Sequence, residues 1–446
     1  MIESEISVHK TMCPMNCHPT YCGMEVLTQN RRIVGVRGDK ENPDSRGFLC
    51  VRGRATIELV ENERRLRTPL RRRGPRGGGE WDPITWDTAL DEIADRMRRA
   101  GRERVALWPG HGSIVNTIGI DLLRRFGNLY GCQSWNPAIV CWGLGGFGAA
   151  LTGVLEANTK EDLGEHAQTI FFWGASLVSQ PSTAPHLTAA RRRGAYVVAI
   201  DCRRTELAGH VDEFVILRPG TDAALALALM HVIVFEELHD CDFVVEYTVG
   251  FDELAESLRE RTPDWAEPIT GVPAATIRQL ARRYAIGKPA TIVMGGASMY
   301  KHANGWQASR AISCLPALTG NLGIAGGGLG PRHRGLSHGQ SLGTLQLAER
   351  RPEGNYSASH MGEIVAALES GQIDALFLAG TNMTSSYADA GRLRKALGQV
   401  GFIVGHDLFL NETLRDCADV VLPGTSWVEE IGLKSTYTHV YLMDRV

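Results

Sequence analysis

Residues 169–176 read TIFFWGAS, an apolar run that ends at Gly174. A short apolar run of this kind predicts a buried strand, and the glycine predicts the turn that follows it. A helical segment, APHLTAARRRG (184–194), comes next, and then a second strand, AYVVAIDCRRT (195–205), in which Asp201 stands at the strand end. The order strand, helix, strand predicts a βαβ unit with parallel strands.

The same arrangement occurs a second time. DALFLAGTN (374–382) ends its apolar run at Gly380, ADAGRLRKALG (388–398) is helical, and GFIVGHDLFLNET (401–413) has Asp407 at its strand end. Gly174 and Asp201 are 27 residues apart, and so are Gly380 and Asp407. Each half then reaches Pro-Gly-Thr after a third apolar run. The sequence therefore predicts two α/β halves related by an internal repeat.

Each half has the features of a nucleotide-binding unit. In an open α/β sheet, ligands bind at the carboxyl ends of the strands, where a glycine lets phosphate approach the backbone and a later acid binds a ribose. In the first half, Arg203 and Thr205 are candidates for phosphate contacts, and Thr221 is expected to cap a helix whose first turn contains Asp222. Each residue alone has an ordinary explanation as a turn or a cap. Two halves imply two nucleotide-like ligands, or one site and one relic.

Four cysteines lie near the start of the chain, in the spacing Cys13-x3-Cys17-x4-Cys22-x27-Cys50. Sets of four cysteines hold either zinc or an iron–sulfur cluster. Three close ligands and one remote ligand are more typical of a [4Fe-4S] cluster, whereas structural zinc usually uses two close pairs. Between Cys22 and Cys50, MEVLTQ and RIVGVRG flank Asn30 and predict a hairpin that returns the chain to Cys50. On these residues alone both metals stay open.

Composition narrows the class of protein. The chain has 446 residues, 43% of them hydrophobic, and a net charge of −3 from 47 basic and 50 acidic residues. This balance gives no broad attraction to nucleic acid or to an anionic membrane. There is no apolar run of membrane-spanning length, and MIESEISVHK lacks the features of a secretion signal, so we expect a cytoplasmic protein without a membrane span. We interpret PLRRRGPRGGGEW (69–81) as a solvated hairpin tip.

The cysteine spacing and the repeated halves occur together with four further phrases: EWDPITWDTALDEIADRM (80–97), DCRRTELAGHVDEFVILRPGTDAAL (201–225), ALTGNLGIAGGG (317–328) and DVVLPGTSWVEEIG (419–432). As a set, these features resemble the molybdopterin oxidoreductase (dimethyl sulfoxide reductase) superfamily over essentially the whole chain. The resemblance implies that Cys13, Cys17, Cys22 and Cys50 hold a [4Fe-4S] cluster. It also implies that the two halves bind two molybdopterin guanine dinucleotides around one molybdenum or tungsten.

By the same resemblance, individual residues match family positions that contact the dinucleotides. For the first dinucleotide these are Gly174, Ser176, Asp201, Arg203, Gly220 and Asp222. For the second they are Gly380, Asn382, Asp407 and Thr413. The family's metal ligand falls in the stretch SWNPAIVCWGLGGFGAAL (134–151), which nominates Cys141; a buried structural cysteine in a glycine-rich loop is the alternative. A thiolate suits a soft, high-valent metal.

Three departures from the family pattern refine this interpretation. Trp142 follows Cys141, where the formate dehydrogenases of the superfamily have histidine, so formate is a poor candidate substrate. Arg52 comes two residues after the fourth cysteine, in the region where those enzymes and the periplasmic nitrate reductases tend to have lysine. The x4 spacing between Cys17 and Cys22 is longer than the usual x2 or x3. The first two departures favour the branch that resembles polysulfide, sulfoxide and other reductases and hydroxylases.

The predicted fold is α/β and multidomain: a small N-terminal iron–sulfur β domain and two Rossmann-like α/β domains. We expect the first over residues 1–68, a discontinuous α/β domain over 69–147 with 336–446, and an inserted α/β domain over 148–335. By the same resemblance the family has a C-terminal β-barrel domain, and the sequence ends at Val446 before it, so we expect a fragment or completion by another polypeptide.

We expect a molybdenum- or tungsten-dependent oxidoreductase that acts on a small molecule and exchanges electrons through the cluster with an electron-transfer protein or subunit. The alternatives are a nonredox tungsten hydratase resembling acetylene hydratase, and a cofactor-binding subunit without turnover. No nucleic acid is expected among its partners.

Overall fold

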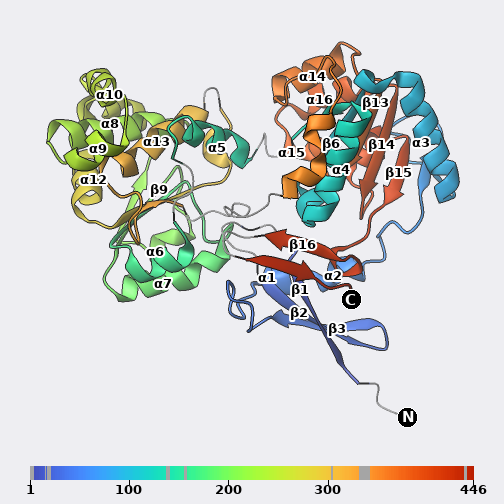
Figure 1. Ribbon diagram of the computed structural model, residues 1–446, viewed down its shortest axis with the longest axis horizontal. Coiled ribbons are helices and arrows are strands. Elements are labelled where there is room, and N and C mark those ends of the chain that lie inside the picture. The colour runs from blue at the N-terminus through green and yellow to red at the C-terminus, as the bar shows by residue number, and fades with distance from the viewer. Residues whose placement is uncertain are drawn as a thin grey trace. The chain divides into compact units, whose positions relative to one another are not determined.

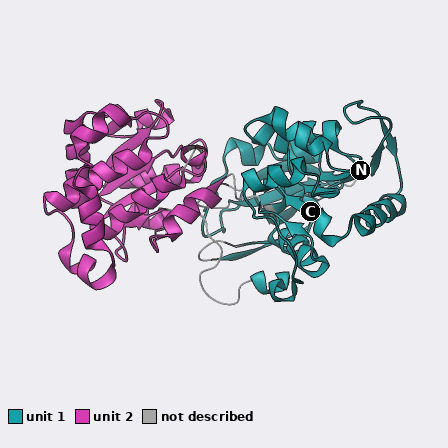
Figure 2. Ribbon diagram, turned by 90° about the horizontal axis from the view of Figure 1, so that it is seen from above, with its two compact units in different colours: residues 1–16, 21–139, 335–446 teal, residues 17–20, 140–334 magenta. Residues whose placement is uncertain are grey.

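The computed structural model describes residues 5–15, 17, 22–136, 141–154, 158–302, 305–330, 342–435 and 439–446. It divides the chain into two compact units, which Figure 2 colours teal and magenta. The first unit takes in residues 1–16, 21–139 and 335–446, and the second takes in 17–20 and 140–334. The division into three domains stays a prediction.

The second unit is built on a parallel sheet. Within the described residues the strand order is β10-β9-β8-β11-β12, and all neighbours are parallel. The strands are β8 (Thr169–Trp173), β9 (Tyr196–Asp201), β10 (Glu213–Ile216), β11 (Ala290–Met294) and β12 (Gly328–Leu329). The helices are α5 (Trp142–Ala150), α6 (Lys160–His166), α7 (Ala184–Arg192), α8 (Asp222–Phe235), α9 (Cys241–Tyr247), α10 (Phe251–Leu258), α11 (Pro263–Thr270), α12 (Ala274–Ile286) and α13 (Trp306–Leu318).

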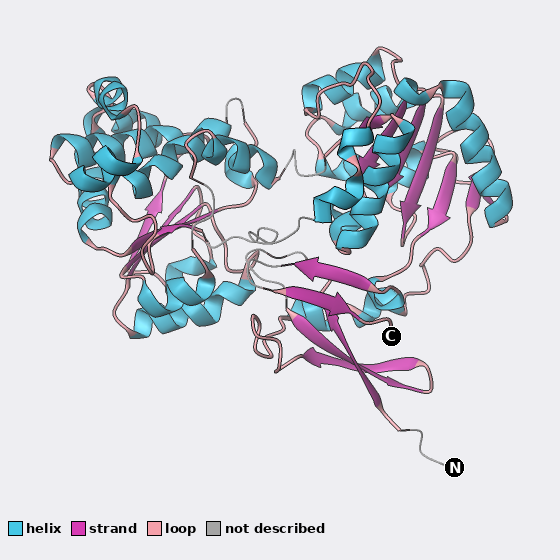
Figure 3. Cartoon of the chain, in the orientation of Figure 1, coloured by secondary structure: helices cyan, strands magenta, loops and turns pink. Residues whose placement is uncertain are grey.

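Alternation along β8 explains why helices cover both faces of this sheet. Phe171 and Trp173 pack in one core, with side chains of α8 and α12. Ile170 and Phe172 pack in the other, with side chains of α6 and α7. Successive strand residues point to opposite faces, so a strand that is apolar throughout must be covered twice. Figures 1 and 3 show helices on both sides of these strands.

The first unit contains a similar sheet. Its order among the described strands is β5-β4-β15-β14-β13-β6-β7, parallel from β15 to β7, with β4 and β5 added antiparallel at one edge. The strands are β4 (Leu70–Arg72), β5 (Trp81–Pro83), β6 (Val105–Pro109), β7 (Gln133–Ser134), β13 (Ala375–Ala379), β14 (Phe402–Asp407) and β15 (Val420–Pro423). The helices are α3 (Trp86–Ala100), α4 (Thr117–Tyr130), α14 (Met361–Glu369), α15 (Met383–Ser386), α16 (Ala390–Gly398) and α17 (Glu412–Cys417).

The repeat is confirmed as a structural repeat. Thr169 pairs with Tyr196 between β8 and β9, and Ala375 pairs with Phe402 between β13 and β14. In both sheets a residue therefore lies opposite the residue 27 positions later, which is the spacing found in the sequence. The orders β10-β9-β8-β11-β12 and β15-β14-β13-β6-β7 correspond strand for strand.

The N-terminal part of the first unit is a small β structure. Strands β1 (Ser7–Met12), β2 (Gly23–Gln29) and β3 (Arg32–Gly38) form an antiparallel sheet, followed by the short helices α1 (Val51–Arg54) and α2 (Ile57–Val60). The predicted hairpin is confirmed: Asn30 and Arg31, between β2 and β3, both have positive φ, at 53° and 60°. The hairpin of β16 (Gly432–Ser435) and β17 (Val440–Met443) lies beside β1, where the Asp444 N–H donates to the Lys10 carbonyl at 3.2 Å. The predicted fold class is confirmed.

In the described part of the chain, no helix combines the length and the apolar character that a transmembrane span requires.

Candidate cofactor-binding sites

The turn that leaves the first strand has the same geometry in both halves. Gly174 has φ of 59° and donates its N–H to the Ile200 carbonyl at 2.8 Å. Gly380 has φ of 57° and donates to the His406 carbonyl, also at 2.8 Å. A positive φ favours glycine. Each turn is therefore hydrogen-bonded to the end of the neighbouring strand. Because its central residue is glycine, no side chain projects from the turn.

A second glycine approaches each turn from the strand on its other side. Gly295 follows β11, and a Cβ added there would lie 1.9 Å from the Gly174 carbonyl oxygen. Gly110 follows β6, and a Cβ added there would lie 2.3 Å from the Gly380 oxygen. Neither position has room for a side chain. The two halves thus form equivalent backbone cradles at the carboxyl ends of their strands, where phosphates bind in open α/β sheets.

The strand-end carboxylates also correspond. Asp201 Oδ1 accepts the N–H groups of Cys202 and Arg203, at 2.7 and 3.4 Å. Asp407 Oδ1 accepts those of Leu408 and Phe409, at 2.7 and 3.3 Å. Burial raises the pKa of Asp407, although these hydrogen bonds and one from Asn411 oppose the shift. Both carboxylates therefore shape the loop after the strand.

A matched pair of polar side chains joins the two loops of each half. Ser176 donates to the Glu206 carboxylate, and Asn382 Nδ2 donates to Glu412 Oε2 at 2.5 Å. In both halves the partners are 30 residues apart. Hydrogen bonds from Ser176 and the Val178 N–H outweigh burial and lower the pKa of Glu206. Glu206 and Glu412 were not among the predicted site residues, although the two halves of the repeat place them at equivalent positions.

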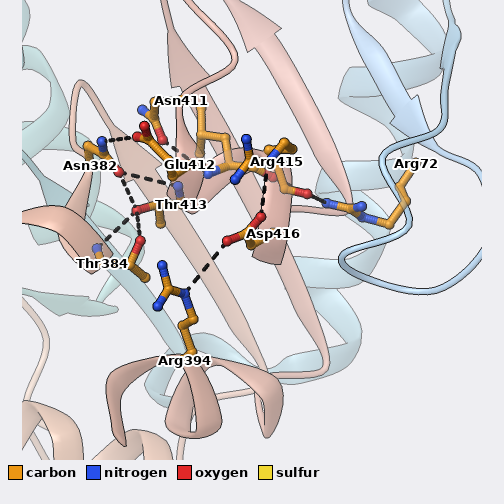
Figure 4. Close-up of polar contacts among 10 residues, drawn as sticks. Arg72, Asn382, Thr384, Arg394, Asn411, Glu412, Thr413, Arg415 and Asp416 are labelled. Carbon is orange, nitrogen blue, oxygen red and sulfur yellow. Dashed lines mark hydrogen bonds and ion pairs between the residues drawn. The ribbon is translucent and has the colours of Figure 1, made fainter. Parts of the chain in front are cut away.

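Thr413 is held inside the protein. It is fully buried, and its hydroxyl donates to Asn382 Oδ1 at 2.8 Å and accepts the Thr384 N–H at 3.0 Å. Figure 4 shows this network from α15 to the first turn of α17. Asn411 extends it, since its Nδ2 donates to Asp407 Oδ2 and to the Thr381 carbonyl, both at 3.0 Å. Thr413 therefore positions the loops around Gly380 and contributes no exposed polar atom.

In the first half, a buried carboxylate at the start of α8 is hydrogen-bonded to the end of β8. Asp222 is 6% exposed and accepts a hydrogen bond from Trp173 Nε1 at 2.9 Å. Burial raises the pKa of Asp222.

The prediction that Thr221 caps α8 is wrong. Its hydroxyl donates to the Arg218 carbonyl at 2.7 Å, which closes the turn before the helix instead. Gly220, in this turn, has φ of 79°, and Arg203 is exposed.

Several buried polar atoms beside the first cradle have no hydrogen-bond partner among the described residues. They belong to the loops that leave β8 and β9 and are Gln180 Oε1, Ser182 Oγ, Thr183 Oγ1 and Thr205 Oγ1. Buried polar groups are normally satisfied, and a cluster of exceptions calls for an explanation. Phosphate or ribose oxygens would supply the missing partners, so the residues of this half fit a nucleotide. Among these four, the sequence pointed only to Thr205.

Two arginines of the β4–β5 hairpin bind the helices of the second half. Arg72 donates to the carbonyls of Ala418 and Arg415, each at 2.6 Å, and stacks on Trp81. Arg76 donates to the Val400 carbonyl at 2.8 Å and to the Asp419 carboxylate. The prediction of a solvated tip is therefore wrong for these two side chains, because they satisfy the carbonyls that helix ends leave open. They fix α16 and α17, and α17 carries Thr413.

Three of the N-terminal cysteines belong to the first unit. The Cys13 N–H donates to the Cys22 carbonyl at 2.8 Å, and both side chains are buried with Leu49. Gly53 leaves room for the Cys13 sulfur, which would lie 3.3 Å from an added Cβ. Cys50 immediately precedes α1. Cys17 is grouped with the second unit, and within the described residues no three His, Cys, Asp or Glu side chains are arranged as a metal site.

The chemistry of these cysteines nevertheless fits an iron–sulfur cluster. Burial raises the pKa of the Cys50 thiol, but hydrogen bonds from the Gly53 N–H and from Arg52 outweigh it, so the pKa lies below its ordinary value. The thiolate is the form that ligates metals. Cys13 and Cys22 thus supply soft donors in one small core, and the Cys50 thiol ionises more readily than an ordinary cysteine.

Cys141 immediately precedes α5, in the second unit. The next residue, Trp142, packs edge-to-face on Tyr300 with ring centroids 6.2 Å apart, and the Tyr300 hydroxyl donates to the Gly295 carbonyl at 3.3 Å. Glycines along α5 allow close packing on α13: an added Cβ at Gly148 would lie 2.1 Å from the Trp306 carbonyl. The residue after Cys141 is therefore connected, through Tyr300, to the glycine beside the first cradle.

Comparison with known proteins agrees with this geometry. The family model described as Molybdopterin oxidoreductase matches residues 65–440. The model described as Molybdopterin oxidoreductase Fe4S4 domain matches residues 6–62, which contain the four cysteines Cys13, Cys17, Cys22 and Cys50.

Individual relatives cover the chain in the same way. The probable oxidoreductase YoaE of Bacillus subtilis is 32% identical over 98% of this chain and 64% of its own length. The dimethyl sulfoxide reductase DmsA of Haemophilus influenzae is 34% identical over 73% of this chain and 45% of its own. The structure of acetylene hydratase from Pelobacter acetylenicus is 26% identical, with a TM-score of 0.84 over 98% of this chain and 66% of its own. This chain thus spans slightly less than two thirds of YoaE, and it belongs to the molybdopterin oxidoreductase family, with that family's Fe4S4 domain over residues 6–62.

Proposed function

We propose that this chain is the cofactor-binding part of a molybdenum- or tungsten-dependent oxidoreductase that carries out two-electron chemistry on a small molecule. The observation that carries the proposal is the duplicated cradle: two turns with matching φ, matching hydrogen bonds and matching glutamate partners. Two equivalent nucleotide sites in one chain suit two molybdopterin guanine dinucleotides. The family match supports molybdopterin and a [4Fe-4S] cluster as the cofactors.

The proposed contacts to the first dinucleotide lie on the loops after β8, β9 and β10. The glycines admit the phosphates, Arg203 and Thr205 bind them, and Asp222 keeps the start of α8 in place through Trp173. Around the second dinucleotide, Asp407 and Asn382 line the cradle, and Thr413 holds Asn382 in position. Each of these proposed roles is based on contacts that the residue makes inside its own unit.

We propose Cys141 as the protein ligand of the metal and Cys13, Cys17, Cys22 and Cys50 as the ligands of the cluster. When bound, the metal with its two pterins supplies the two-electron redox chemistry, and the cluster supplies a one-electron relay. The chain contributes the thiolate and a position for it at the start of α5, which packs on α13. An electron-transfer protein or subunit is the proposed partner.

A second candidate function has one specific observation in its favour. The structure of acetylene hydratase superposes on almost the whole of this chain with a TM-score of 0.84. A hydratase uses its metal as a Lewis acid and needs no electron acceptor. Turnover that requires an added acceptor, together with cycling of the cluster signal, favours the oxidoreductase; turnover without an acceptor favours the hydratase. A loaded protein without either activity would be a cofactor-binding subunit.

Elemental analysis of anaerobically purified protein, expressed from its complete gene, tests the proposal. About four irons with one molybdenum or tungsten per chain are expected. Zinc alone, with no iron and neither molybdenum nor tungsten, would overturn both cofactor assignments.

The assignment of Cys141 has its own test. Cys141→Ala should abolish turnover while the four irons remain. Cys314→Ala is the control, because Cys314 is a partly buried cysteine on α13 whose thiol donates to the Arg310 carbonyl, at 3.4 Å. Unchanged activity in Cys141→Ala would exclude the thiolate as the metal ligand.

A further inference from the structure

A cavity of about 870 Å³ lies within the second unit, among α8, α9, α10, α13 and the residues that follow α5, helices that Figure 1 labels on one side of the sheet. Most of its wall is apolar. The apolar side chains that line it include Leu227, Met230, Phe251, Leu254, Ala311 and Ala317. None of the residues proposed to bind the dinucleotides, the metal or the cluster lines it. Pockets that hold small molecules are of this size and are mainly apolar, with a few placed polar groups.

The hydroxyl groups in the wall of the cavity already have partners. Those of Ser257, Thr248 and Thr152 each donate to a backbone carbonyl three or four residues earlier in the chain, at 2.7, 2.6 and 2.7 Å. The Ser313 hydroxyl donates to the Arg310 carbonyl at 2.9 Å. Because these donors are used within the protein, they contribute little to the binding of another molecule.

Two polar side chains of α13 differ from these hydroxyls. Gln307 and Arg310 stand one turn apart on α13 and both line the cavity. Neither side chain has a hydrogen bond or an ion pair with any residue that the structure describes. Among the described residues that line the cavity, Arg310 is also the single charged one, and a guanidinium keeps its charge at every pH a protein tolerates. The wall thus combines one permanent positive charge, one amide and a large apolar surface.

The opening of the cavity is apolar as well. Three of its lining side chains are largely exposed to solvent: Leu151 at 52%, Tyr247 at 66% and Val249 at 100%. Clustered exposure of this kind is typical of ligand-binding grooves and interaction surfaces. Burial of these side chains and of the apolar wall would favour an occupant with an apolar body, and Arg310 would favour one with a negative charge.

We propose that this cavity binds a small amphiphilic carboxylate, that is, a carboxylic acid with an apolar chain. The carboxylate pairs with the Arg310 guanidinium, whose planar fork matches its two oxygens, and Gln307 Nε2 donates a further hydrogen bond. One arginine and one amide suit a single negative charge. The apolar chain lies against the side chains of α8 and α10. Binding is non-covalent and does not depend on the cofactors proposed above.

The experiment is isothermal titration calorimetry of the purified chain with decanoate, below its micelle concentration, as the probe. We expect one decanoate per chain. Arg310→Met removes the charge, keeps most of the apolar stem and should weaken binding about tenfold, because a charged hydrogen-bond donor is lost. Arg282→Met is the matched control: Arg282 is also an exposed arginine of this unit, but it lies on α12, pairs with Glu236 and does not line the cavity. Its affinity for decanoate should match that of the unsubstituted protein.

A second variant and a second probe test the apolar part of the site. Ala317→Phe fills part of the cavity and should also weaken decanoate binding about tenfold, while its thermal midpoint without ligand shows that the protein is folded. Butyrate has the same carboxylate and six fewer methylene groups, so it should bind at least about a hundredfold more weakly. No binding of decanoate, or equal affinities in Arg310→Met and the unsubstituted protein, would overturn the proposal. Butyrate that binds as tightly as decanoate would overturn it too, since the apolar cavity would then not be the site.

Discussion

Thr413 donates its hydroxyl to Asn382 Oδ1 at 2.8 Å and also gives that oxygen its backbone N–H at 3.2 Å. This pair joins the loop after β13 to the first turn of α17. The family resemblance placed both residues in contact with a dinucleotide, but Thr413 is fully buried. Some residues near a cofactor site thus have polar atoms that can bind the cofactor, whereas others, such as Thr413, use their polar atoms in hydrogen bonds within the protein.

Thr413→Val should destabilise the first unit. The substitution leaves the buried Thr384 N–H without its acceptor and deprives Asn382 Oδ1 of one donor. An unsatisfied buried group costs about 1–3 kcal/mol, so the free energy of unfolding in urea should fall by that amount. Thr188→Val on α7 is the control, because Thr188 is exposed; it should change the free energy by less than about 0.5 kcal/mol. Equal effects of the two substitutions would contradict the network.

Gly110→Ala should disrupt the second cradle. The added Cβ would lie 2.3 Å from the Gly380 carbonyl, and backbone must move to admit it. Overpacking of this kind costs about 1–3 kcal/mol, measurable as a lower thermal midpoint. Gly119→Ala on α4 is the matched substitution, since nothing lies within 4 Å of its added Cβ. Gly119→Ala should stabilise the helix by about 0.5–1 kcal/mol. If Gly119→Ala lowers the thermal midpoint as much as Gly110→Ala does, the close approach of Gly110 to Gly380 is not the cause of the destabilisation.

Arg72→Met should destabilise the packing of α17 and lower the free energy of unfolding. Arg72 gives hydrogen bonds to the carbonyls of Ala418, Leu414 and Arg415, which would lose their charged donor. We expect a loss of about 1.5–3 kcal/mol in urea unfolding. Among the residues that the structure describes, the neighbouring Arg73 side chain makes exposed ion pairs, at 3.4 and 3.5 Å, so Arg73→Met should cost less than about 1 kcal/mol. If the two arginines prove equivalent, the hairpin does not act as an anchor.

Cys50 should alkylate at a lower pH than an ordinary cysteine in protein stripped of iron. Its lowered pKa means that the thiolate persists as the pH falls below the usual value of about 8.5. Mass spectrometry of iodoacetamide-treated peptides gives the pH profile of each cysteine. Arg52→Met should move the Cys50 profile to higher pH. Burial raises the pKa of Cys132 to about 12, so this thiol should remain unmodified near neutral pH, and its early modification would indicate unfolding.

The sequence was informative where the chemistry is local or repeated. The 27-residue spacing became the register of both sheets, and Asn30 marked a real hairpin turn. It was uninformative where contacts join distant segments. Nothing near residue 434 indicates that Lys434 donates to the Cys13 carbonyl, and nothing in the arginine run reveals the helix ends that Arg72 and Arg76 bind. Thr221 shows a third limit: a residue with the right side chain stands at the right place, yet its hydroxyl bonds to the preceding turn.

The placement of β6 has a consequence for biosynthesis. The sheet of the second unit needs only residues 169–329, a single uninterrupted stretch, and can form as soon as that stretch has left the ribosome. In the first unit, β6 ends at Pro109 and its partner β13 begins at Ala375. Contacts of such long sequence separation form slowly, and domains generally fold as they are made. The sheet of the second unit can therefore form before β13 has been synthesised, whereas β6 cannot pair with β13 until then.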